Sequence, residues 1–462
     1  MRDPALPPDR AGGAPAVRPG GAARRWIAAA LAVLTPVGVV LGLSADLRDH
    51  LSLVSGLWSS HGVTEMSGPY RVIMAGVLVD DSAMDGRDVG DRMEEINQST
   101  FELFEKRMRK IDVGVAREKD FEPQEWKGES ERRQYLTRLL NVSNADLAVS
   151  ILLKPGRLRT TMNVEFLGSS DGDEATELAG FNSFGDETLS GFSSPSTEAR
   201  VAKAVRSRSE SYLTLMRAVS SYGIGEYTDS IEQFTRSQKN LTTVQFQRFS
   251  LMMLGNATGR AGDDAQARER AARFFRKSLR LDPSYGRARL GLAEVLFQQA
   301  LRESGDEEAR CSDWPRAQMD QMFAARRAYE EVLASDDRYG IPGVETRARY
   351  GMGRADTCLT LAGDETRLKP AIDQLEKVIS AYRAQPDQQW LQALASEAHA
   401  CIALSYVLGP VGQVRWNWAV DHYRQAQTLA VDPGRLKTLN TQLQDLLSLA
   451  HPAPPVLVTP LQ

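Results

Sequence analysis

Reactive side chains are scarce in this sequence. Its 462 residues include three Cys and five His, which excludes a disulfide framework and argues against a multi-ligand zinc site. The chain also lacks a G-x-G-x-x-G sequence, a P-loop lysine motif and an H-E-x-x-H sequence. These absences predict a protein that is not an enzyme and that carries no metal or cofactor.

An excess of positive charge is also missing. The chain has 56 basic and 60 acidic residues and a net charge of -4, so it has no general attraction for the phosphates of nucleic acids. The hydrophobic fraction is 42% before 36 glycines are added, which is typical of a folded protein. The length is that of about three domains.

A long hydrophobic run occurs near the amino terminus. Residues 1–25 are rich in Pro and Gly and predict a disordered tail. From Trp26 to Leu43 there is no charged residue over 18 positions, a helical length of about 27 Å, which is close to the thickness of a bilayer core. Residues 26–44 therefore predict one transmembrane helix, followed by a stalk over 45–68.

The flanking charges predict its orientation. Five arginines precede the run and only Arg48 follows closely, so a cytoplasmic amino terminus and extracytoplasmic remaining domains are expected in the cell membrane. Two alternatives stay open. Arg24 and Arg25 before an apolar stretch also resemble a twin-arginine export signal that is cleaved, and the run could instead be a buried core helix.

Residues 69–170 predict a small open α/β sheet domain. A continuous apolar strand is expected at 72–79, a helix across 90–110 and a short strand at 112–116. A second amphipathic helix at 130–143 then leads into strands at 145–153 and 157–167, joined by a turn at Lys154-Pro155-Gly156. The segment from Asn144 to Ser150, followed by a turn and an alternating strand, resembles the amino-terminal domain of the TolB family. That resemblance implies a fold and no catalytic residue.

Asp80 and Asp81 follow the first predicted strand directly. An acidic pair at this position resembles the magnesium-holding acids of phosphorylation receiver domains, but Ile151 stands where the phosphoacceptor carboxylate should be. The two acids are therefore interpreted as solvated residues at a strand end. They lie at the edge where open α/β sheets bind ligands, which keeps a small-ligand hypothesis open.

Residues 171–199 are dense in Gly, Ser, Asp and Thr and predict a linker. Beyond it, residues 200–450 contain self-similar helical units, and a disordered tail is expected at 451–462. Ala218 and Ser230, Gly255 and Ala271, Ala293 and Ala325, Ala348 and Ala371, and Ala403 and Ala419 provide the small residues of five helix pairs. Each second helix carries a large anchor, at positions 234, 275, 329, 375 and 423.

This pattern resembles the tetratricopeptide repeat family, in which antiparallel helices pack through small residues and an aromatic anchor. The anchors here are 41, 54, 46 and 48 residues apart, against about 34 in that family. A looser α-solenoid is the alternative, with the same architecture. The resemblance implies a TPR-like superhelix with a concave groove that binds protein or peptide partners.

The same resemblance places particular positions of the first helices in that groove. In two successive units they are Arg287, Leu290, Glu294, Arg347, Tyr350 and Arg354. Arginines in a groove predict binding of acidic peptide segments, although these residues could equally be solvated helix positions. Leu215 and Val219 replace the Lys and Asn of a carboxylate clamp, which disfavours chaperone-tail binding.

Two functions follow from this reading. The first is a single-pass membrane scaffold that binds a protein partner through its repeats. The second is an extracytoplasmic sensor, in which the α/β domain binds a small molecule and the repeats relay the signal. Cys358 and Cys401 lie at apolar spacing in first helices, which predicts packing and not chemistry for them.

Overall fold

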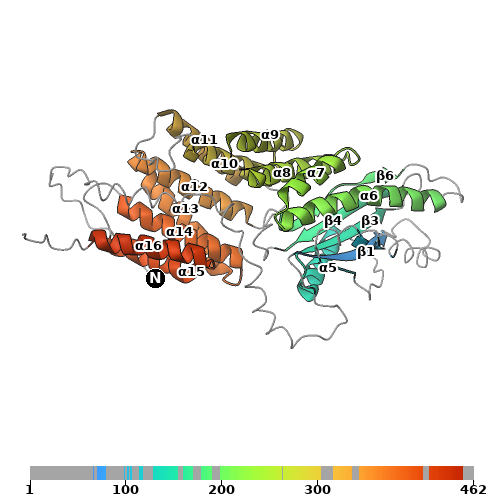
Figure 1. Ribbon diagram of the computed structural model, residues 1–462, viewed down its shortest axis with the longest axis horizontal. Helices are drawn as coiled ribbons and strands as arrows, with labels where there is room; N and C mark the ends of the chain where they lie inside the picture. Colours follow the sequence, from blue (N-terminus) through green and yellow to red (C-terminus); the bar gives the residue numbers. More distant parts are fainter. Residues whose placement is uncertain are drawn as a thin grey trace, which may run out of the picture.

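The computed structural model places a small mixed sheet against one end of a curved array of helices (Figure 1). It describes residues 66, 70–79, 98, 101–102, 105–106, 114–117, 128–154, 160–169, 178–189, 198–262, 264–302, 316–335, 343–408 and 416–450. The predictions for 1–25, 26–44, 451–462, Asp80 and Asp81 lie outside these residues. No helix within the described ranges combines the length and the apolar character that a membrane crossing requires.

The sheet has six strands in the order β2-β1-β3-β4-β5, with β6 paired to β4. Its core is β1 (Arg71–Val79), β3 (Leu147–Lys154) and β4 (Thr160–Gly168), and β2 (Gly114–Arg117) lies at one edge. The first three strands in this order are parallel, and β4 is antiparallel to β3. These strands and helix α5 (Glu129–Ser143) confirm the predicted α/β unit.

The two faces of the sheet bury different partners, because side chains alternate along a strand. Ile73, Ala75 and Ala148 pack against the apolar stripe of α5. Met66, in the segment expected as a stalk, joins this cluster, and its N–H donates to the carbonyl of Ser143 at 3.2 Å. The opposite face, with Val72 and Val149 among its members, packs against the first helices of the array.

The expectation of a linker at 171–199 is wrong for its described part. Strands β5 (Gly180–Ser183) and β6 (Glu187–Leu189) both pair with β4. Phe184 is 1% exposed, and its ring centroid lies 5.1 Å from that of Phe249 in the array. Leu178 and Phe184 fill the space between the sheet and the helices, so the two parts share one hydrophobic core.

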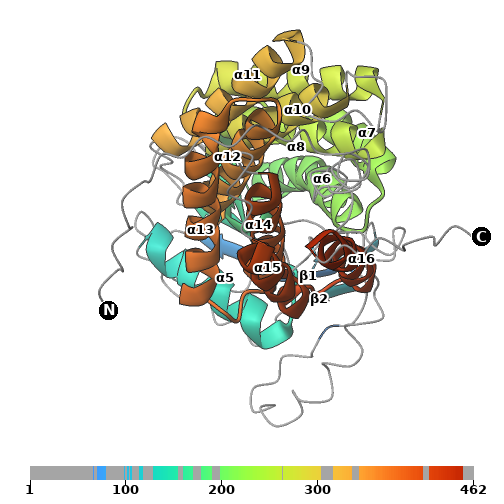
Figure 2. The same ribbon diagram turned by 90° about the vertical axis from the view of Figure 1, so that its left-hand side faces the viewer.

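Eleven described helices follow the sheet and form five pairs and a final helix. They are α6 (Glu198–Gly223), α7 (Tyr227–Ser237), α8 (Val244–Ala261), α9 (Ala265–Leu281), α10 (Gly286–Arg302), α11 (Arg316–Ala334), α12 (Val344–Leu361), α13 (Leu368–Ala384), α14 (Gln389–Leu408), α15 (Trp416–Leu429) and α16 (Pro433–Ala450). From α8 onward, first helices pack beside the next first helix, while second helices pack between two first helices. Figure 2 shows the resulting curved array.

Small residues allow the close packing that the sequence predicted. The Oγ of Ser230 donates to the carbonyl of Ala218 at 2.9 Å, which joins α6 to α7. A β-carbon added at Gly255 or at Gly291 would lie 2.7 or 2.4 Å from the ring of Phe275. That ring therefore fills the space between two first helices. The anchors at 234, 275, 329, 375 and 423 are all buried, and the prediction of helical repeats is confirmed.

Candidate partner-binding surface

Glu294 on α10 and Arg354 on α12 bring two successive repeat units into direct contact. The Nη2 of Arg354 donates to both carboxylate oxygens of Glu294, at 2.8 and 2.9 Å. The guanidinium lies between two aromatic rings, with its Cζ 4.4 Å from the ring centroid of Phe297 and 4.5 Å from that of Tyr350. The sequence-based prediction thus selected residues that meet in space.

The burial of Arg354 acts on its protonation. Arg354 is 1% exposed, and burial alone would lower its pKa. The adjacent Glu294 carboxylate and two tyrosines outweigh that effect and hold the pKa of Arg354 well above its usual value. The side chain is therefore a fixed positive charge held between α10 and α12.

A second ion pair lies on the last helices of the array. The Nη2 of Arg435 on α16 donates to Glu397 on α14 at 2.7 Å. Asp432 caps α16 by accepting a hydrogen bond from the N–H of Arg435 at 2.8 Å, which orients this helix end. Burial raises the pKa of Glu397 even though Arg435 and Arg354 act against the shift. Glu397 and Arg435 also act electrostatically on Tyr350.

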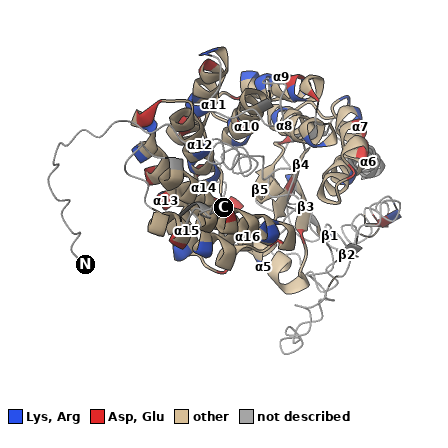
Figure 3. Cartoon of the chain, turned by 60° about the vertical axis from the view of Figure 1, so that its left-hand side comes forward, with Lys and Arg blue, Asp and Glu red and all other residues tan. Residues whose placement is uncertain are grey.

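These five residues form what we call the inner row: Glu294, Tyr350, Arg354, Glu397 and Arg435. They lie on α10, α12, α14 and α16, and the four charged members alternate in sign along these helices. Figure 3 shows a similar mixture of basic and acidic residues over the described helices. The row contains both hydrogen-bond donors and acceptors, and Glu294, with 36% of its side chain exposed, is its most accessible member.

Several polar atoms at this row have no hydrogen-bond partner among the described residues. They include the Nε and Nη1 of Arg354, the Oη of Tyr350 and both amide atoms of Gln298, which lies one turn after Glu294 on α10. Buried donors without partners are costly, by about 1–3 kcal/mol each. Such atoms mark a place where acceptors from another molecule would be stabilising.

Other residues predicted for the groove have different surroundings. Arg287 is buried, and its Nη2 donates to the carbonyl of Ala179 beside β5. Its expected role in an open groove is wrong, because the sheet covers the array at this point. Leu290 packs against the repeat core. Arg347 is half-buried on α12, with its Cζ 5.7 Å from the ring centroid of Trp390.

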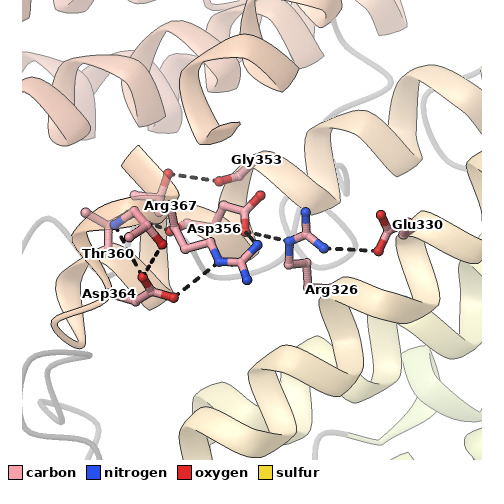
Figure 4. Close-up of polar contacts among 9 residues, drawn as sticks. Arg326, Glu330, Gly353, Asp356, Thr360, Asp364 and Arg367 are labelled. Atoms are coloured by element: carbon pink, nitrogen blue, oxygen red, sulfur yellow. Dashed lines mark hydrogen bonds and ion pairs between the residues drawn. The ribbon is translucent and has the colours of Figure 1, made fainter. Parts of the chain in front are cut away.

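Asp356 was not selected from the sequence, yet it organises a further polar cluster on α12 (Figure 4). Its buried carboxylate accepts from the Nε of Arg326 on α11 at 2.7 Å, and Arg367 lies 3.8 Å away. Burial raises the pKa of Asp356, against the effects of Arg326 and Arg367. The cluster joins α11, α12 and the turn before α13. The available signal was a carboxylate near the end of α12, where residues 357–361 carry no charge.

The described residues include no group of three or more His, Cys, Asp or Glu side chains arranged to hold a metal ion. Cys358 and Cys401 are free and buried, as the packing interpretation expected. Burial raises the pKa of Cys401 to about 12, so this thiol is not a nucleophile at neutral pH.

No family model and no curated protein sequence matches this chain.

Proposed function

We propose that this chain is a partner-binding repeat protein whose inner row holds an extended segment of another protein. The observation that supports it is the set of donors on Arg354 and Tyr350 that have no hydrogen-bond partner within the part of the chain that the structure describes. Carbonyl oxygens or carboxylates of a partner would satisfy them. Glu294, whose side chain is 36% exposed, is the member of the row that a partner reaches directly.

The proposal includes two expectations from the sequence. The repeats are of the tetratricopeptide type, which is supported by the buried small residues and anchors at the corresponding positions of five helix pairs. Residues 26–44 anchor the chain in the cell membrane, with the repeats outside the cytoplasm, so the protein acts as a membrane-bound scaffold. Protection of the repeats from protease added to intact cells would contradict that topology.

Site-specific photocrosslinking tests the surface in the full chain. Arg347 and Arg349 both lie on α12, but Arg349 contacts Glu345 and Gln374 on the side facing α13. A photoreactive phenylalanine at position 347 should give a discrete crosslinked species, and the same residue at 349 should not. Equal crosslinking from both positions, or from neither, would show that this face does not bind a partner.

A sensor is the second candidate, because the sheet and the array are not independent. Thr243 at the start of α8 donates from its Oγ1 to the carbonyl of Phe184, and Arg287 donates to Ala179. A molecule bound to the sheet could therefore affect the repeats directly. If a compound raises the melting temperature of the full chain and slows amide exchange in both β3 and α8, the sensor function is favoured.

A further inference from the structure

Two histidines from neighbouring helices are in direct contact in the last repeat unit. The Nδ1 of His399 on α14 lies 2.9 Å from the Nδ1 of His422 on α15, and their ring centroids are 5.0 Å apart. His399 is 5% exposed and His422 is half-buried. Tyr406 on α14 stacks beside His422, and Trp418 packs edge-on against Tyr406.

This contact imposes a rule on protonation. A neutral imidazole has one N–H and one bare ring nitrogen. A hydrogen bond between two Nδ1 atoms therefore needs one protonated and one bare Nδ1. If both rings carry a proton on Nδ1, two N–H groups face each other at hydrogen-bond distance and the contact becomes repulsive. The arrangement is compatible with neutral rings and incompatible with two imidazolium ions.

The surroundings also disfavour positive charge on the pair. Burial, the neighbouring His422 and Arg383 on α13 together lower the pKa of His399 to about 4, from an ordinary value of 6.5. Burial and Arg383 lower the pKa of His422 as well, while Asp421 on α15 acts in the opposite direction. Among the described residues, Arg383 and Asp421 are the charged side chains that act on the pKa values of this pair.

We propose that the His399–His422 pair is a proton-operated joint between α14 and α15, closed at neutral pH and opened by acid. α15 packs against α16, and α16 carries Arg435, which pairs with Glu397 on α14. Opening the joint therefore loosens the end of the inner row. The joint itself does not depend on partner binding, whereas its effect on a partner rests on the proposed function.

The sign of the effect follows from proton linkage. His399 binds a proton less readily in the folded protein than in an open state, so protons favour the open state. The effect begins as the pH falls below 6.5, grows through the acid range and levels off below about 4. Each pH unit within this window changes the opening equilibrium by up to about tenfold for one group.

Amide hydrogen exchange of the full chain at pH 7 and pH 4.5, corrected for intrinsic rates, tests the proposal. Exchange in α14 and α15 should increase by up to about 100-fold relative to α8 and α9. The double variant His399→Asn with His422→Asn is the matched control, because two amides can replace the hydrogen bond without titrating. It should show no acid-induced increase, and the same increase in both proteins would overturn the proposal.

Two exposed charges give a measurement that does not depend on the folding of that double variant. Arg383→Gln should raise the pKa of His399 in the folded protein and so weaken the acid-induced opening, whereas Asp421→Asn should lower the pKa of folded His422 and strengthen the opening. Nitrogen NMR of labelled histidines should show one protonated and one bare Nδ1 at pH 7. Acid-induced opening that both substitutions leave unchanged, or two histidines that titrate near 6.5, would show that the pair is only a packing contact.

Discussion

Arg132 and Glu165 are joined by two hydrogen bonds, of 2.7 and 2.9 Å, between α5 and the middle of the sheet. Both residues are buried, and Asn163 donates to the same carboxylate at 3.3 Å. A charge pair with this geometry orients α5 on β4. Removing either residue would therefore leave the other as a buried charge without a counter-charge.

Arg132→Met should lower the free energy of unfolding by about 3–5 kcal/mol, because Glu165 is then buried without its partner. The double variant Arg132→Met with Glu165→Leu should recover most of that loss, since two apolar side chains need no counter-charge. Urea denaturation of the full chain measures both. If the single and double variants lose the same free energy of unfolding, the loss does not come from an uncompensated charge on Glu165.

Gly351→Ala should lower the free energy of unfolding by about 1–3 kcal/mol through overpacking. Its new β-carbon would lie 2.2 Å from the ring of Tyr329. Gly259→Ala, in the exposed last turn of α8, meets nothing closer than 3.8 Å and should raise the free energy by about 0.4–1 kcal/mol. Thermal denaturation gives both signs, and a stabilising effect at 351 would contradict the packing described for Tyr329.

Thr243→Ala should lower the free energy of unfolding by more than the loss of an ordinary helix N-cap does. Thr243 accepts from the N–H of Phe246 at the start of α8 and also donates to Phe184, so a loss of about 2–3 kcal/mol is expected. Asp264→Ala removes only the cap of α9, where Asp264 accepts from Ala267 at 2.6 Å, and should cost about 1 kcal/mol. Amide exchange should rise in β5 and β6 for the first variant and not for the second.

The pH dependence of unfolding should reveal Asp229. Burial opposes ionisation of this carboxylate, but hydrogen bonds from Ser221, Arg217 and Gln233 outweigh burial and lower its pKa. A lowered folded pKa stabilises the fold above 3.8, and this contribution is lost as the pH falls through the folded value. Asp229→Asn should therefore cost about 1–3 kcal/mol at pH 7. The difference from the native chain should shrink below pH 4, and a constant difference would exclude ionisation as its cause.

The helical repeats could be predicted because their packing depends on local pattern. Small residues such as Ala218 and Ser230, and anchors such as Tyr329, recur at intervals that only paired helices explain. Apolar runs and alternation likewise identified β1, β3 and β4. Hydrophobic periodicity carries this information along the chain without knowledge of distant contacts.

What could not be predicted depends on contacts between segments far apart in the sequence. Phe184 lies in a polar stretch typical of a linker, and nothing local indicates that Phe249 will cover it. The repeat spacing places Arg287 at a groove position, but in the structure its guanidinium donates to the carbonyl of Ala179 beside β5. The six groove residues were also expected to face solvent, whereas the pairing of Arg354 with Glu294 requires the neighbouring repeat.

The core shared by the sheet and the first helices closes the array at its beginning. A repeat array exposes apolar surface at each terminal unit, and a capping element normally covers it. Here the sheet covers α6 and α8, and α16 packs against the last pair. A fragment that starts at residue 200 would expose Phe246 and Phe249 to water, so it would be prone to aggregate and to bind other proteins nonspecifically. Partner binding is therefore measured meaningfully only on a chain that keeps its sheet.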